Sequence, residues 1–203
     1  MPTILFVCTG NTCRSPMAEY LLKDMLQNRD DIDDWNVKSA GISALPGVKM
    51  SEQALQALAE EEIEVDGHRA KNINENLLEE ADIVLTMTLS HKKHLKSEGK
   101  IEESKIFTLK ELIGYNEELD ILDPYGQSLE VYKKTRDEIK DALTNLIVKL
   151  NQSFSSKKEN YFNENNIIRG DMMKIAIGSD HAGYKLKEEI KSLLEEKGLF
   201  YQD

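Results

Sequence analysis

The N-terminal stretch constrains the fold most, because it predicts a strand, a short polar loop and a helix in direct succession. Thr3–Val7 (TILFV) is a short apolar run rich in β-forming residues, which indicates a buried strand. Pro16 lies near the expected first position of the helix, and Ser15 is a candidate N-cap. The residues after Pro16 place one apolar face at helical spacing: Met17, Leu21, Leu22 and Met25. CTGNTCRS is therefore expected to be a strand-to-helix loop.

The same alternation continues along the chain. Further strands are expected at Asn36–Ala40, Asp82–Met87 and Lys105–Leu109, and helices at Ser51–Glu61, Ser90–Glu98 and Ser128–Leu150. Strands alternating with helices predict a parallel sheet covered on both faces. We therefore expect residues 1–150 to form a small doubly wound, four-stranded, flavodoxin-like α/β domain. Ligands of such sheets bind beyond the carboxyl ends of the strands, where the first loop lies.

The character of the sequence changes after Leu150. Residues 151–171 are polar, rich in Asn and Ser, and without sustained periodicity, which predicts a linker. Met173–Gly178 then indicates a new strand and Ala182–Lys197 an amphipathic helix. Residues 172–203 are thus expected to be a partial βα unit that ends before a second strand, and we expect it to be loosely attached.

Composition excludes several classes of partner. The chain has 203 residues and a formal net charge of -11, which disfavours binding to nucleic acid or to anionic membranes. No apolar run approaches the ~20 residues that span a bilayer, and the N-terminus lacks the features of a signal peptide. Two cysteines make no disulfide framework, so we expect a cytoplasmic protein whose cysteines are thiols.

The first loop carries a cysteine and an arginine at a C-x5-R spacing. A tight loop before a helix turns backbone N–H groups inward to form an anion site, and Arg14 adds a planar fork that fits two phosphate oxygens. This positive field favours the reactive thiolate of Cys8. A thiolate beneath a bound phosphoryl group is placed for in-line attack, which gives a phosphocysteine. The alternative is a buried structural Cys8 with Arg14 in a surface ion pair.

Other residues of the loop and one distant motif fit this chemistry. Ser15 can donate a hydrogen bond to the thiolate, Asn11 tolerates left-handed backbone, and Gly10 permits a φ that a side chain resists. Asp123, stiffened by the following proline, is the candidate proton donor and Tyr125 a candidate pocket wall. An ordinary turn is the alternative for Asp123 and its proline. The predicted phosphate loop also includes Thr9, Thr12 and Cys13.

Together these motifs resemble the low-molecular-weight protein tyrosine phosphatase family. The resemblance runs from Thr3 to about Leu150 and includes VCTGNTCRSPMAE, SAGI, GHRAKNI, ADIVLTM and DPYG. It implies the phosphatase I type of fold and phosphorylated proteins as substrates, without a metal or cofactor. It also implies Cys8 as the nucleophile, Arg14 as the phosphate clamp and Asp123 as the general acid.

Two positions bear on the substrate. The family's tyrosine phosphatases usually carry Ile or Leu where this chain has Thr12, and often two aromatic residues where it has Tyr125 and Gly126. A phenyl ring favours apolar walls, whereas a phosphoguanidinium group is planar, polar and rich in donors. The loop also looks most like the bacterial protein-arginine phosphatase branch. We therefore expect phosphoarginine, with phosphotyrosine as the alternative.

The second cysteine leaves further functions open. In loops of this family the two sulfurs approach closely, which implies a reversible Cys8–Cys13 disulfide; a small buried apolar filler is the alternative for Cys13. Arsenate reductases share the fold and loop but relay electrons through later cysteines, and no cysteine follows Cys13. A noncatalytic phosphate-binding protein is the third possibility. A monomer is favoured.

The remaining features have plainer interpretations. SDHAG (residues 179–183) resembles the first strand–helix turn of ribose-5-phosphate isomerase B, but the rest of that family's site is missing. His91 and His94 are expected on a solvated helix face rather than at a metal, and His68 is expected to support structure near Arg69. The acidic residues of the 30–34 loop indicate a solvated turn, and Trp35 core packing.

Overall fold

A computed structural model describes residues 1–27, 35–99, 101–155, 175–176 and 201–202. The chain divides into two compact units, residues 1–160 and 161–203, and each is described by itself.

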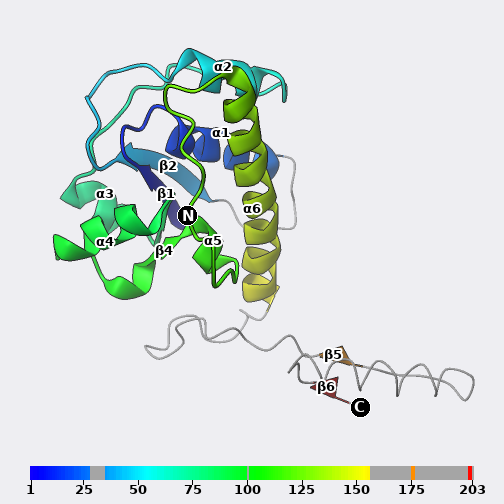
Figure 1. The fold of residues 1–203 in the computed structure, drawn as a ribbon. Helices are drawn as coiled ribbons and strands as arrows, with labels where there is room; N and C mark the ends of the chain where they lie inside the picture. The colour runs from blue at the N-terminus through cyan, green and yellow to red at the C-terminus, as the bar shows by residue number, and fades with distance from the viewer. Residues whose placement is uncertain (28–34, 100, 156–174, 177–200, 203) are drawn as a thin grey trace, which may run out of the picture. The chain divides into compact units, whose positions relative to one another are not determined.

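The first unit is built on a parallel sheet whose strand order is β2-β1-β3-β4 (Figure 1). Its strands are β1 (Thr3–Cys8), β2 (Asn36–Gly41), β3 (Ile83–Thr86) and β4 (Ile106–Thr108). Strand β1 pairs in parallel with both β2 and β3, so that Cys8 lies beside Gly41 and Val7 beside Thr86. Strand β4 pairs in parallel with β3. The predicted four-stranded parallel sheet is confirmed, and β1 delivers Cys8 to its carboxyl edge.

Helices cover both faces of the sheet, as the sequence predicts (Figure 1). One face carries α1 (Arg14–Gln27), α2 (Glu52–Ala59), α5 (Leu109–Leu112) and α6 (Leu129–Ser155). The other carries α3 (Glu75–Glu80) and α4 (Leu89–Ser97). The alternation of β1 divides the core accordingly: Ile4 and Phe6 pack on the α1–α6 side, and Leu5 and Val7 on the α3–α4 side. β1 is buried along its whole length and apolar from Ile4 to Cys8.

The structure corrects several predicted boundaries. Helix α1 begins at Arg14, and the Cys13 carbonyl accepts the Met17 N–H at 3.1 Å, so Ser15 lies inside the helix and is not its N-cap. Helix α6 continues to Ser155 rather than ending at Leu150, because no Pro or Gly interrupts the chain before Gly170. The short helices α3 and α5, and a 3₁₀ turn at Glu103–Lys105, were not predicted. Each is too short to show helical periodicity.

The second unit contains a pair of parallel strands, β5 (Ile175–Ala176) and β6 (Tyr201–Gln202). β5 lies within the predicted strand at 173–178. The expectation that the chain ends before a second strand is wrong, because β6 provides one. Residues 199–202 (LFYQ) offer too short an apolar run to identify that strand from the sequence. The predicted helix at 182–197, the linker residues 156–171 and the SDHAG turn lie outside the described residues.

Candidate active site

The loop of residues 8–15, here called the phosphate loop, joins β1 to α1 at the carboxyl edge of the sheet. Cys8 and Arg14, the two residues of its C-x5-R spacing, are only 3% and 4% exposed. The neighbouring segment holds the loop from outside, because Ile42 and Ser43 donate their N–H groups to the carbonyls of Cys8 and Thr9, both at 2.9 Å. The predicted strand–loop–helix arrangement is therefore present.

Asn11 is the internal brace of the phosphate loop. Its φ is 54°, the left-handed conformation that an Asn side chain makes tolerable by local hydrogen bonding. Its Oδ1 accepts the Lys71 N–H at 2.9 Å, which fixes the orientation of the amide. Its Nδ2 then donates to the hydroxyls of Ser15 at 3.0 Å and Ser39 at 2.8 Å. His68 Nε2 donates to the Asn11 carbonyl at 2.9 Å, so His68 supports this loop, in line with its predicted structural role.

The orientation of Asn11 makes the Ser15 hydroxyl an acceptor and leaves its single proton for another partner. Ser15 Oγ accepts from Asn11 at 3.0 Å and can donate to the Ala40 carbonyl at 3.2 Å or to Cys8 Sγ at 3.0 Å. A negatively charged sulfur is the stronger acceptor of the two. Ser15 is therefore placed to donate to Cys8 when that sulfur carries a negative charge.

The chain of hydrogen bonds extends to a buried carboxylate. Ser39 accepts from Asn11 and donates to Glu19 Oε2 at 2.5 Å. Glu19 is 7% exposed, and its other oxygen pairs with Lys23 at 2.5 Å. The sequence places Ser39 within the SAGI motif but gives no signal for the role of either Ser39 or Glu19. These contacts hold the floor of the phosphate loop in one arrangement.

The glycine that the loop requires is Gly41 rather than Gly10. The φ of Gly10 is not in the positive range, and a Cβ there would meet Thr12 Oγ1 at 3.4 Å, so the predicted need for a special φ is wrong. A Cβ on Gly41 would lie 2.5 Å from the Thr9 carbonyl oxygen and 2.9 Å from the Asn11 nitrogen. Gly41 thus allows β2 to pass directly beneath the loop.

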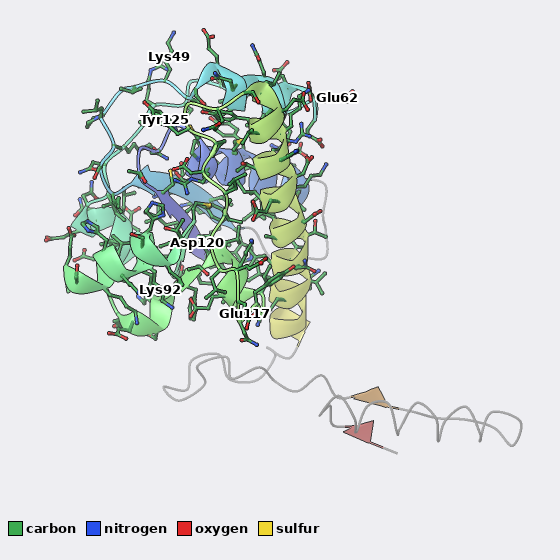
Figure 2. The ribbon with its side chains drawn as sticks, viewed as in Figure 1. Lys49, Glu62, Lys92, Glu117, Asp120 and Tyr125 are labelled. Atoms are coloured by element: carbon green, nitrogen blue, oxygen red, sulfur yellow. The ribbon has the colours of Figure 1, made fainter. Side chains whose placement is uncertain are left out.

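Arg14 faces the residue predicted as the proton donor. Its Nη2 lies 2.5 Å from Asp123 Oδ2, and its Nη1 donates to the Ile121 carbonyl at 3.4 Å. The Arg14 side chain is 5% exposed whereas that of Asp123 is 53% exposed, so the carboxylate stands at the mouth of the site. The Tyr125 N–H donates to Asp123 Oδ1 at 3.2 Å. Tyr125, labelled in Figure 2, is 75% exposed and is not among the residues that line the hollow beside the loop, so the structure gives no support to its predicted role as a pocket wall.

Cys13 lies away from the mouth and contacts the long helix. Its sulfur is 3.2 Å from the Tyr132 hydroxyl, 3.5 Å from that of Ser51 and 3.6 Å from that of Thr12. Burial raises the pKa of Tyr132 to about 12, and its hydrogen bond with Cys13 acts in the same direction. Thr12 is partly buried, and both Cys8 and Cys13 are free thiols.

The prediction that His91 lies on a solvated helix face is wrong. His91 is 5% exposed, with Nε2 at 2.9 Å from Thr9 Oγ1 and Nδ1 at 2.9 Å from Thr88 Oγ1. Burial, with the charge of Arg14 acting in the same direction, lowers the pKa of His91 to about 4. His94, three residues later, is exposed and pairs with Glu98 at 3.4 Å. The missed signal is topological: α4 follows β3, so its first turn lies at the same sheet edge as the phosphate loop.

An open hollow lies at the sheet edge beside the phosphate loop. It is bounded by Thr9, Arg14, His91, Asp120, Ile121 and Asp123, among others. Asp120, on the segment between α5 and α6, accepts the Leu89 N–H that begins α4 at 2.7 Å (Figure 2). Among the described residues, no group of three or more His, Cys, Asp or Glu is placed to hold a metal, and no helix is both long and apolar enough to cross a membrane.

Comparison with known proteins agrees with this geometry. The family described as low molecular weight phosphotyrosine protein phosphatase matches residues 3–157. The chain is 44% identical over 147 residues to a protein-arginine-phosphatase of Bacillus subtilis, covering 72% of this chain and 95% of that protein. It is similar to a solved low molecular weight protein tyrosine phosphatase from T. tengcongensis, with 46% identity, a TM-score of 0.67 and coverage of 74% and 100%.

A second similar structure carries a phosphoryl group at its active site. It is a cysteine-to-serine mutant of the YwlE arginine phosphatase with a phosphorylated active-site serine, 44% identical with a TM-score of 0.68, and the match covers 73% of this chain and 95% of that one. The residue that replaces the cysteine in that protein therefore carries a phosphoryl group. With its C-x5-R loop, its parallel sheet and its match over residues 3–157, the chain belongs to the low molecular weight phosphotyrosine protein phosphatase family.

Proposed function

We propose that this phosphatase hydrolyses phosphoarginine in proteins, with Cys8 as nucleophile, Arg14 as phosphate clamp and Asp123 as general acid and base. The observation that carries the proposal is the Ser15 hydroxyl 3.0 Å from the Cys8 sulfur, inside a loop that Arg14 closes. This hydrogen bond and the backbone N–H groups of the loop favour a thiolate below the phosphoryl site.

The reaction proceeds in two balanced steps. The Cys8 thiolate attacks phosphorus, the S–P bond forms, and the P–N bond breaks with its electron pair moving to nitrogen, which takes a proton from Asp123. Water then attacks phosphorus while Asp123 accepts its proton. The S–P bond breaks, phosphate leaves and the thiolate returns.

The ion pair between Arg14 and Asp123 places the acid beside the phosphate clamp. Arg14 Nη2 lies 2.5 Å from Asp123 Oδ2. A bound phosphoryl group takes the guanidinium fork of Arg14 and draws it away from the carboxyl group. Asp123 then faces the leaving nitrogen, to which it donates its proton.

Thr12 supports phosphoarginine as the substrate. Its hydroxyl gives the loop a polar side chain at a position where an apolar one would suit a phenyl ring. The Bacillus subtilis relative that is 44% identical is a protein-arginine-phosphatase, which supports the same assignment. Protein tyrosine phosphatase activity is the alternative, supported by the T. tengcongensis relative.

Peptides that carry phosphoarginine or phosphotyrosine in one sequence context test the choice. We expect a higher kcat/KM on phosphoarginine for the native protein and a shift toward phosphotyrosine for Thr12→Ile. If the ratio of kcat/KM on phosphoarginine to kcat/KM on phosphotyrosine is unchanged in Thr12→Ile, Thr12 does not determine the specificity. If the native protein prefers phosphotyrosine, it is a protein tyrosine phosphatase. Thiol-dependent arsenate reduction without phosphatase activity would contradict both assignments.

We also propose redox control of the site. Peroxide oxidises the Cys8 thiolate to a sulfenic acid, the Cys13 thiolate attacks that sulfur, and water leaves as the disulfide forms. Mild peroxide followed by non-reducing peptide mapping is expected to give a Cys8–Cys13 linkage and reversible loss of activity. Irreversible inactivation without that linkage refutes the proposal.

The proposal extends to the oligomeric state, the compartment and the C-terminal residues. The enzyme works as a monomer in the cytoplasm, where its thiols stay reduced, and residues 172–203 form a separate unit resembling part of ribose-5-phosphate isomerase B. Removal of residues 156–203 is expected to leave kcat/KM unchanged, and sedimentation is expected to give one chain per particle. A large loss of activity in the shortened protein contradicts the separation.

A further inference from the structure

His91 links the phosphate loop to an element on the opposite face of the sheet. It is the third residue of α4, whose N-cap is Thr88. Its ring lies between two hydroxyls, with 2.9 Å from Nε2 to Thr9 Oγ1 and 2.9 Å from Nδ1 to Thr88 Oγ1. Thr9 directly follows Cys8, so this side chain is the contact of α4 with the start of the loop.

Other elements hold the loop as well, among them the segment before α2, because the Ser51 N–H donates to the Thr12 carbonyl at 3.0 Å. The N–H groups of Ile42 and Ser43 hold the first carbonyls of the loop, and His68 holds the carbonyl of Asn11. These three bonds restrain the loop backbone on one side. The bond from His91 restrains Thr9 from α4, a different element.

The donors and acceptors around the His91 imidazole can all be paired. Thr88 Oγ1 already accepts the His91 backbone N–H at 3.2 Å, and Thr88 is less exposed than Thr9. If the Thr88 hydroxyl donates to Nδ1, then Nε2–H donates to Thr9, and only the exposed Thr9 proton is left for solvent or substrate. A neutral imidazole satisfies every group in this way.

The surroundings keep the ring neutral. Burial disfavours the imidazolium most, and Arg14 and His94 add like charge, whereas Asp120 and Asp123 act in the opposite direction. Together these lower the pKa of His91 to about 4. The ring is therefore neutral at pH 7 and adds no cation beside Arg14.

We propose that His91 is a positioning residue for phosphoryl transfer, which fixes the start of the phosphate loop by its hydrogen bond to Thr9. It acts through Thr9 and does not touch the reacting atoms. Its purpose is to keep the loop N–H groups aimed at the phosphoryl oxygens as charge develops on them. The inference rests on the proposed phosphatase function.

A double-mutant cycle tests this bond directly. His91→Asn and Thr9→Val each remove one partner, and the double variant removes both. One hydrogen bond corresponds to a fall in kcat/KM of about two- to tenfold. We expect each single variant to fall within this range, through kcat more than KM, and the double variant to be no worse than the poorer single one.

Two further measurements separate positioning from simple support of the fold. His94→Asn, an exposed histidine on the same helix, serves as the matched control and should retain native kcat. Inhibition by inorganic phosphate should weaken in His91→Asn and Thr9→Val at a temperature where thermal melting shows both fully folded. Multiplicative losses in the double variant, or lower melting temperatures with unchanged kcat and phosphate inhibition, overturn the proposal. A native protein that hydrolyses no phosphorylated substrate refutes instead the function on which it rests.

Discussion

Replacing Asn11 removes the central brace of the phosphate loop in a measurable way. Its side chain makes three hydrogen bonds, to Ser15, Ser39 and the Lys71 N–H. Each of these hydrogen bonds contributes about 0.5–1.5 kcal/mol. Asn11→Gly should therefore lower the free energy of unfolding by about 2–4 kcal/mol. Asn11→Ala should lower the free energy of unfolding by about 1 kcal/mol more than Asn11→Gly. The reason is that alanine at a φ of 54° is in the left-handed conformation, which is unfavourable for alanine but not for glycine.

Glu62 provides the matched control, since it is exposed and has a φ of 60°. Glu62→Ala and Glu62→Gly report the backbone cost without the buried hydrogen bonds. Urea unfolding gives the free energies, and kcat/KM should fall at least about tenfold in both Asn11 variants, since 1.4 kcal/mol of lost transition-state binding is tenfold. If Asn11→Ala costs no more than Glu62→Ala, or if Asn11→Gly keeps native kcat/KM, the reasoning is wrong.

Three further variants test separate parts of the site. Asp123→Asn should lower kcat on phosphoarginine about 100-fold but kcat on p-nitrophenyl phosphate far less, because nitrophenolate leaves without a proton; equal losses contradict the acid role. Because the folded pKa of His91 is lowered to about 4, the unfolded state binds more protons between about pH 4 and 6.5. Stability should therefore fall as pH drops through that window, and His91→Asn should flatten this slope in urea titrations; an unchanged slope contradicts the burial argument. Tyr132→Phe should cost about 1 kcal/mol of stability by the same assay through the lost Cys13 contact, and a neutral effect would show that the contact is dispensable.

Local patterns predicted the fold and the two ends of the phosphate loop well. A buried strand, a C-x5-R loop and an amphipathic helix lie within one short stretch, so Cys8 and Arg14 needed no long-range information. Asp123 was found because a strand–helix loop of a parallel sheet ends at the same edge. Periodicity could not show α3 and α5, which are shorter than the window in which it can be recognised.

The parts that were missed depend on contacts between distant segments. His91 lies on a lysine-rich helix whose composition indicates a solvated face, yet its ring is buried because the first turn of α4 meets Thr9. Gly41 and Ser39 matter because β2 passes beneath the loop, a fact of sheet order rather than of local sequence. Ser15 lies 3.0 Å from Cys8 Sγ but is not the N-cap, since α1 begins at Arg14 and Ser15 lies inside it.

Trapping the covalent intermediate tests the central claim most directly. The Asp123→Asn variant is mixed with a phosphoarginine peptide, quenched rapidly in acid and mapped by mass spectrometry, with Cys8→Ala as the control. The account predicts one phosphoryl group on Cys8, absent from Cys8→Ala, which should show no turnover. A phosphoryl group on another residue, or turnover that survives in Cys8→Ala, would contradict it.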